Sequence, residues 1–113
     1  MEDTIQITTT ADRREVLEEV ARRLLEERLV SCAQILGPMT SMYWWKGKIE
    51  KNEEWLCLLK TRKALFEGVE REIRQLHPYE VPEIIALDIT HSHAAYGAWL
   101  LEETRGAPAG EGR

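Results

Sequence analysis

The 113-residue sequence lacks an excess of positive charge, and this absence limits its partners. It contains 15 Lys and Arg against 20 Asp and Glu, for a formal net charge of −5. Its paired arginines, at 13–14 and 22–23, stand among glutamates and form no basic run. Proteins that bind nucleic acid need a basic face to displace counterions from the phosphates. We therefore expect neither nucleic acid nor an anionic membrane surface as a partner.

Long apolar runs and cysteines are also scarce. No stretch approaches the ~18 apolar residues of a membrane span, and the first residues, Met-Glu-Asp, begin no apolar signal segment. There are two cysteines, Cys32 and Cys57. With no export signal recognised, this small number favours a reduced, cytoplasmic protein in which the two cysteines are not bridged.

Common catalytic and metal-binding motifs are missing as well. The sequence contains no Cys-x-x-Cys, no His-Glu-x-x-His, no glycine-rich phosphate loop and no nucleophile elbow, the patterns that would indicate zinc, nucleotide or acyl-transfer chemistry. His91 and His93 are two residues apart, which is more typical of a loop leading into a helix than of a metal pair. We expect no enzymatic activity.

The first half of the chain alternates between strand and helix patterns. Residues 4–10 alternate apolar with polar side chains and predict a strand. Asp12 and Glu15 resemble a capping box ahead of a helix that runs to about Arg28. Residues 29–45 predict a strand with a bend or bulge at Gly37-Pro38. A turn at 46–48 then leads into a third strand through Leu59, which completes a long β-hairpin.

The second half predicts a helix, a strand and a further helix. We expect Thr61 to cap the helix that follows it. His77-Pro78 should end that helix, because a residue before proline avoids the helical region. Residues 83–89 predict the fourth strand. Ser92 is expected to cap the last helix, whose apolar face consists of Tyr96, Trp99 and Leu100. The apolar face of the helix that follows Thr61 consists of Leu65, Phe66, Val69, Ile73 and Leu76.

The order β-α-β-β-α-β plus one helix predicts an α+β, ferredoxin-like fold with an antiparallel sheet and two main helices on one face. We assign residues 1–105 to a single domain and 106–113 to a disordered tail. The third and fourth strands are apolar on both faces, and two helices cover only one. A second copy of the chain is the simplest cover for the other face, so we expect an oligomer.

Four strings in this order resemble one known family. They are Glu-Arg-Leu-Val-Ser-Cys-Ala at 27–33, Tyr-Trp-Trp-Lys-Gly-Lys-Ile-Glu at 43–50, Leu-Lys-Thr at 59–61 and His-Pro-Tyr-Glu-Val-Pro-Glu-Ile at 77–84. Together with Tyr96 and Trp99, they make the chain similar to the divalent-cation tolerance protein family, CutA, over about residues 4–104. The resemblance implies a ferredoxin-like subunit in a tight trimer. The long hairpin of each subunit would pair with its neighbours, as in the PII signalling proteins.

The resemblance also implies copper tolerance and binding of Cu(II), which is not required for folding. His77 matches a proposed copper ligand of the family. Some bacterial members have two further proposed ligands, a cysteine on the first strand and a histidine before the His-Pro pair. The corresponding positions here are Thr8 and Leu76, so Cys32 becomes the candidate second ligand.

Further matching residues are assigned by the resemblance to a cleft between subunits: Tyr43, Trp44, Trp45, Lys60, Tyr79 and Pro82. By residue type alone, the aromatic cluster at 43–45 is typical of core or interface packing, with a small-ligand pocket as the alternative. Three functions remain open. The first is a trimer that binds Cu(II) or a related divalent ion, and the second is a PII-like module that senses a small ligand in the cleft. The third is a purely structural trimer.

Overall fold

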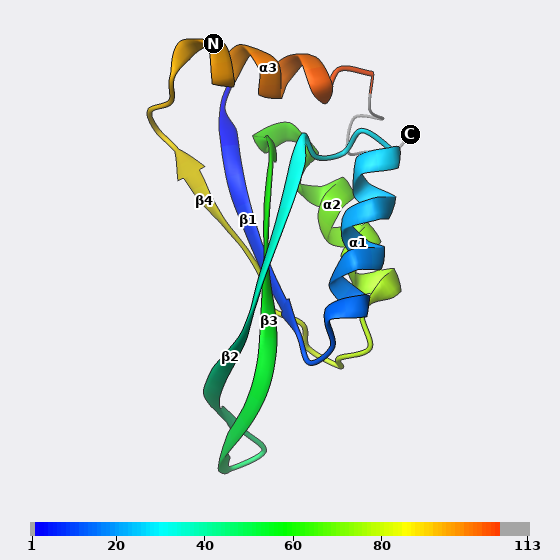
Figure 1. The fold of residues 1–113 in the computed structure, drawn as a ribbon, viewed down its shortest axis with the longest axis vertical. Coiled ribbons are helices and arrows are strands. Elements are labelled where there is room, and N and C mark those ends of the chain that lie inside the picture. The colour runs from blue at the N-terminus through cyan, green and yellow to red at the C-terminus, as the bar shows by residue number, and fades with distance from the viewer. Residues whose placement is uncertain (1, 107–113) are drawn as a thin grey trace.

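A computed structural model describes residues 2–106 and contains one four-stranded sheet with three α-helices (Figure 1). The strand order is β2-β3-β1-β4, and every neighbouring pair is antiparallel. This arrangement confirms the predicted α+β, ferredoxin-like fold with an additional C-terminal helix. The elements are β1 (Thr4–Ala11), α1 (Arg14–Glu26), β2 (Cys32–Trp45), β3 (Lys48–Arg62), a 3₁₀ turn (Lys63–Leu65), α2 (Phe66–Leu76), β4 (Ile84–Ile89) and α3 (Ala94–Glu103).

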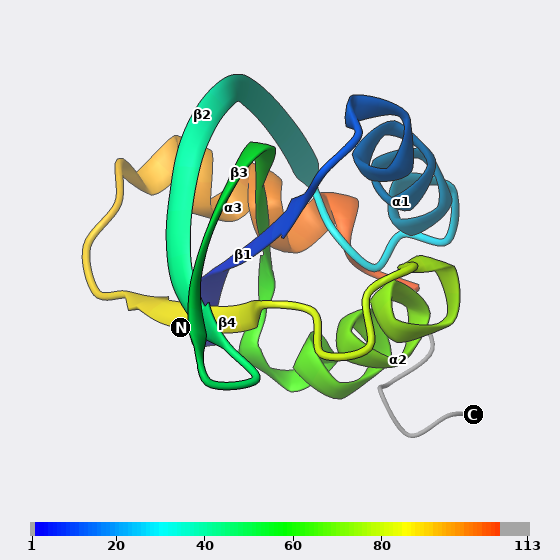
Figure 2. The ribbon, with the colours of Figure 1, turned by 90° about the horizontal axis from the view of Figure 1, so that it is seen from below.

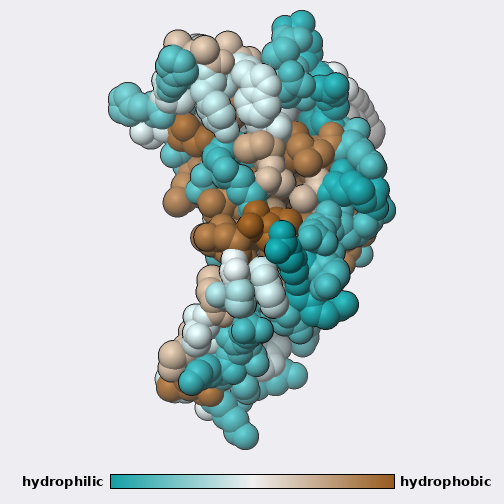
Figure 3. Space-filling view, in the orientation of Figure 1, coloured by the Kyte–Doolittle hydropathy of each residue, from teal (hydrophilic) through white to brown (hydrophobic). Residues whose placement is uncertain are grey.

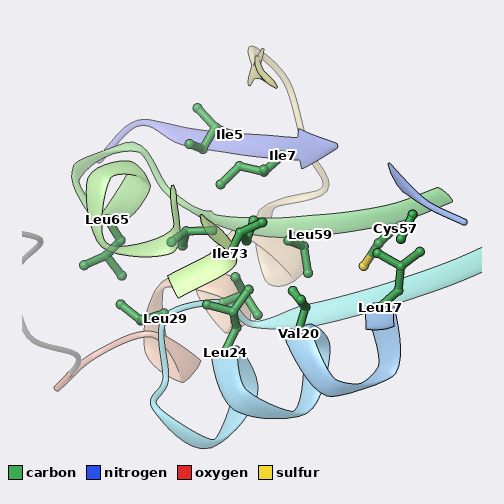
Figure 4. Close-up of a cluster of buried hydrophobic side chains, with 13 residues drawn as sticks. Ile5, Ile7, Leu17, Val20, Leu24, Leu29, Cys57, Leu59, Leu65 and Ile73 are labelled. Atoms are coloured by element: carbon green, nitrogen blue, oxygen red, sulfur yellow. The ribbon is translucent and has the colours of Figure 1, made fainter. Parts of the chain in front are cut away.

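The core lies between one face of the sheet and the helices α1 and α2, which sit together on one side of it (Figures 1 and 2). Period-two alternation in β1 buries Ile5 and Ile7 while their neighbours are partly exposed. The predicted helix stripes point at these residues from the other side (Figure 4). Burying a Leu or Ile side chain contributes about 1.5–3 kcal/mol, so this shared layer holds the strands and helices together. The buried helix residues include Leu17, Val20, Leu24, Val69 and Ile73.

The hairpin of β2 and β3 extends beyond the core (Figure 1). Its turn places Lys46 at φ 51° and Gly47 at φ 84°, the two positive φ values of a tight hairpin turn. The predicted bulge is confirmed, since the β2–β3 register shifts between Leu36 and Met39. Gly37 has φ +148° there, and a Cβ atom on it would lie 2.8 Å from Cδ1 of Trp55.

Three predicted helix caps are wrong. Thr61 belongs to β3, and its hydroxyl donates to the Leu29 carbonyl at 2.6 Å, so α2 begins only after the 3₁₀ turn. Asp12 and Ser92 do not cap either, because the residues at the N-caps of α1 and α3 are Arg13 and His93, with no side-chain cap bond.

The second strand also starts later than predicted, at Cys32 instead of residue 29. Arg28 takes a left-handed conformation at φ 60°. This lets the Leu29 N–H bond the Leu24 carbonyl at 2.9 Å, which closes the end of α1.

The second face of the sheet is covered only at one end. Arg62 of β3 donates to the Leu101 carbonyl and to the Thr104 hydroxyl of the α3 end. Beyond α3, Leu36, Ile85 and Leu87 are 52%, 51% and 62% exposed. The view in Figure 3 shows hydrophobic residues in a band across the strands and again near the hairpin end. The predicted surplus of apolar sheet surface is therefore confirmed.

Two predictions about the chain's limits stay predictions. The domain limits 1–105 are not tested by the described residues, and the expected tail, apart from Gly106, lies outside them. Within residues 2–106, no helix is long and apolar enough to cross a membrane.

Candidate functional site

A groove of about 660 Å³ lies between the hairpin, the end of β1 and the loop from α2 to β4. Four of the residues predicted to share a cleft line it together, Tyr43, Trp44, Trp45 and Tyr79. The first three come from the distal half of β2, and Tyr79 comes from the loop after α2. The other lining residues are Thr10, Ser41, Met42, Glu54, Glu80, Val81 and Glu83.

His77 holds the loop that carries Tyr79. Its side chain is only 8% exposed. Nε2 lies 2.6 Å from the Thr10 carbonyl oxygen, and Nδ1 accepts the Tyr79 backbone N–H at 3.1 Å. These bonds require a neutral imidazole with its proton on Nε2. The His77 and Tyr79 rings also meet edge-on, with centroids 4.6 Å apart, so His77 ties the loop to the end of β1.

Tyr79 in turn contacts a buried carboxylate. Its hydroxyl donates to Oε2 of Glu54 at 2.6 Å. Burial, followed by this hydrogen bond, raises the pKa of Tyr79 above its usual value, so the phenol keeps its proton. Glu54 is 6% exposed, and among residues 2–106 it has no ion pair with a Lys, Arg or His side chain.

Cys32 lies at the opposite end of the sheet. Its Sγ is 3.6 Å from the Tyr96 hydroxyl of α3. Burial, with a smaller contribution from Cys32, raises the pKa of Tyr96 to about 12. The second cysteine, Cys57, is fully buried in the core, and burial raises the pKa of its thiol to about 12. Since the thiolate is the form that binds metals, Cys57 is not available as a ligand.

The two predicted metal ligands, His77 and Cys32, do not meet within one chain. Cys32 pairs with Lys60, which pairs with Gln6, whereas His77 bonds Thr10, four residues further along β1. Four residues of strand span about 13 Å. In the described part of the chain, no three His, Cys, Asp or Glu side chains are close enough to hold a metal ion. A copper centre built from a single chain therefore does not fit these residues.

The remaining predicted cleft residues lie outside the groove. Lys60 donates to Gln34 at 2.8 Å on the half of the sheet that carries Cys32. Pro82 lines an adjoining pocket of about 290 Å³, which it shares with Tyr79 and Arg74. Whether the groove lies between subunits stays a prediction.

Sequence reasoning missed the acidic residues of the groove. Glu54 stands in a charged run, Glu50 to Glu54, and a glutamate in such a run is usually solvated. The alternation of side chains along a strand offered a signal. Glu50, Asn52 and Glu54 lie on the same face of β3, and Glu50 is the cross-strand partner of Tyr43.

Comparison with known proteins gives consistent matches across the chain. The family model described as "CutA1 divalent ion tolerance protein" matches residues 5–103. The divalent-cation tolerance protein CutA of Pyrococcus horikoshii is 44% identical over 101 residues, covering 89% of this chain and 98% of that protein. The crystal structure of CutA1 from Oryza sativa has a TM-score of 0.89 and 32% identity, and covers 93% of this chain and 96% of its own. The periplasmic divalent cation tolerance protein CutA from Archaeoglobus fulgidus has a TM-score of 0.87 and 35% identity, with coverages of 90% and 99%.

Proposed function

Because the chain belongs to the CutA1 divalent ion tolerance family, we propose that it acts in tolerance of divalent cations as a homotrimer that binds Cu(II). The trimer and the preference for copper come from the resemblance. The observation that carries the proposal is the apolar surface left uncovered on the sheet and the hairpin.

Two exposed apolar surfaces support the homotrimer. The open sheet face presents Leu36, Ile85 and Leu87, and the hairpin presents the cross-strand pair of Trp44 and Ile49, 72% and 61% exposed. Monomeric proteins rarely leave contiguous apolar patches of this kind open to water. Copies that lay their hairpins over one another's sheets would bury both surfaces at once. Size-exclusion chromatography with light scattering tests this, and a monomer would contradict it.

Copper binding is proposed at Cys32 and at His77 as separate ligands. Cys32 is partly exposed, and its one hydrogen-bond contact within residues 2–106 is the weak one with Tyr96. A His77 nitrogen would have to give up its bond to Thr10 or to the Tyr79 backbone before it could bind a metal. Thiolate and imidazole are both ligands that copper accepts. A complete coordination shell at either position needs donors from another copy of the chain.

Native mass spectrometry with one copper equivalent per chain tests this assignment. We expect a trimer that takes up copper in whole steps and resists zinc. Cys32→Ser and His77→Ala should each reduce the uptake, and His93→Ala, which changes an exposed histidine, should not. Uptake that all three variants leave unchanged, or that zinc matches, would contradict specific copper binding.

A PII-like sensor of a small ligand is the second candidate function. The groove lined by Tyr43, Trp44, Trp45 and Tyr79 favours it, since it combines aromatic walls with a few polar groups. A thermal-shift screen of nucleotides, small anions and amines tests it. No stabilisation by any of these compounds would contradict it.

The cellular location is likewise proposed. We place the protein in the cytoplasm, where a thiol such as Cys32 stays reduced. One related structure, from Archaeoglobus fulgidus, is described as periplasmic. Fractionation of the source cells, with detection by an antibody, decides between the two compartments.

A further inference from the structure

The charged side chains that line the groove beneath the hairpin are all acidic. Its lining includes the carboxylates of Glu54, Glu80 and Glu83, and no Lys, Arg or His. The nearby Arg74 lines the adjoining pocket and not the groove itself. A cavity with this lining repels phosphates and carboxylates and attracts positive charge.

Glu54 needs a positive partner more than the other two carboxylates do. It is 94% buried, since only 6% of its surface is exposed, and its one described hydrogen bond comes from the neutral Tyr79 hydroxyl. A buried carboxylate is costly unless it is paired as well as hydrogen-bonded. Among residues 2–106 no basic side chain supplies that pair. A cation bound in the groove would supply the positive charge that pairs with Glu54.

The aromatic walls favour an organic cation. Four rings line the groove, those of Tyr43, Trp44, Trp45 and Tyr79, and an ammonium group is attracted to the face of such a ring within about 6 Å of its centre. The chain already shows this geometry, because the ammonium nitrogen of its own Lys46 lies 5.5 Å from the Trp45 ring centroid.

A bare metal ion does not suit the same groove. A metal needs several donor atoms around one point at about 2.0–2.6 Å, and the described residues contain no such cluster of three. Carboxylates spread along a volume of about 660 Å³ instead match a ligand with positive charges spread along its length.

We propose that the groove binds an organic cation with two or more ammonium groups, such as a linear polyamine. One ammonium pairs with Glu54 beside Tyr79, a second lies near Glu80 and Glu83, and the methylene chain packs on the rings of Tyr43 and Trp45. This inference rests on the second function proposed above, that the groove binds a small ligand, and it names the class of that ligand.

Titration calorimetry of the full chain with spermidine tests the proposal. We expect saturable binding with one spermidine per chain. Glu54→Gln should raise the Kd about tenfold or more, because it removes one partner of a buried charge pair. The Gln side-chain oxygen can still accept the Tyr79 bond, so the fold is retained, as circular dichroism will show. The matched control is Glu53→Gln, which makes the same charge change on the neighbouring, exposed residue and should leave the Kd within twofold.

Three results would overturn the proposal. An equal rise in the spermidine Kd for Glu53→Gln and Glu54→Gln would show that spermidine is attracted to the acidic protein in general and not to the groove. Dissociation of the assembly by Glu54→Gln, seen by native mass spectrometry, would show that a basic residue of another copy fills the groove. Absence of spermidine binding would also overturn it. If ATP or citrate binds instead, the groove remains a ligand site and only the ligand class is wrong; if nothing binds, the sensor function fails with it.

Discussion

Replacing His77 with Ala separates two roles for this residue, a structural anchor and a copper ligand. The variant loses the 2.6 Å bond between Nε2 and the Thr10 carbonyl and the 3.1 Å bond from the Tyr79 N–H. Each is worth about 0.5–1.5 kcal/mol. It also loses the edge contact with the Tyr79 ring, whose centroid lies 4.6 Å away, worth about 0.5–1.5 kcal/mol. We expect the free energy of unfolding to fall by roughly 2–4 kcal/mol, which lowers the Tm by about 8–17 °C for a domain of this size.

Urea denaturation at a fixed chain concentration, in EDTA, measures this loss without metal. His93→Ala is the control, because His93 is exposed and a surface change of this kind costs about 0.5 kcal/mol at most. A His77→Ala variant as stable as the unmodified protein in EDTA would refute the anchor role. If the two proteins then differed only after Cu(II) is added, His77 would be a metal ligand and not a structural residue.

Four further predictions concern other parts of the fold. Gly37→Ala should lower the free energy of unfolding by about 1–3 kcal/mol, measured in urea, because the new Cβ would lie 2.8 Å from Trp55 at φ +148°; an unchanged midpoint would contradict the close approach. In Ellman's assay on the folded protein Cys32 should react and Cys57 should not, with both reacting in urea. Burial raises the pKa of Cys57 from 9.0 to about 12, so the thiol loses its proton at a lower pH in the unfolded chain than in the folded one. The free energy of unfolding that the buried thiol contributes therefore falls as the pH rises from 9 to 12. Cys57→Ala should flatten that slope, and an equally steep slope in the variant would contradict the assignment. Leu87→Lys should dissociate the oligomer without unfolding the chain, because it puts a charge on a 62% exposed apolar face; a retained trimer in light scattering would show that this face is not an interface.

Helices and strands with a strong period were predictable, and so was the end of α2 at His77, whereas the starts of the helices and of β2 were not. The stripe of Val69 and Ile73 is set by spacing within one helix, and the structure buries both residues as expected. Thr61 has the side chain of a helix cap, but its hydroxyl bonds the Leu29 carbonyl of another segment. Local preference cannot reveal such a bond, because the partner lies 32 residues away. The bulge at Gly37-Pro38 was predictable because proline cannot donate to the sheet ladder.

The aromatic part of the groove could be predicted. The aromatic residues at 43–45 and Tyr79 were recognised from their strings, and the structure brings them together. Glu54 was not recognised, since a glutamate in a charged run is usually solvated. The tertiary structure buries it and places the Tyr79 hydroxyl 2.6 Å from its Oε2.

The sequence by itself determined the order of the elements, the buried faces of α1 and α2 and the surplus of apolar strand surface, because hydrophobic periodicity acts over a few residues. The apolar face predicted for α3 was wrong in part, since Leu100 is buried but Tyr96 and Trp99 are 38% and 40% exposed. Tertiary structure alone decided which polar groups meet. It separated His77 from Cys32 along the sheet, bonded His77 to Thr10 across 67 positions, and enclosed Glu54 beside Tyr79 with no basic side chain in the groove lining. These outcomes depend on strand register and on a loop closing against a distant strand, which no local pattern of residues encodes.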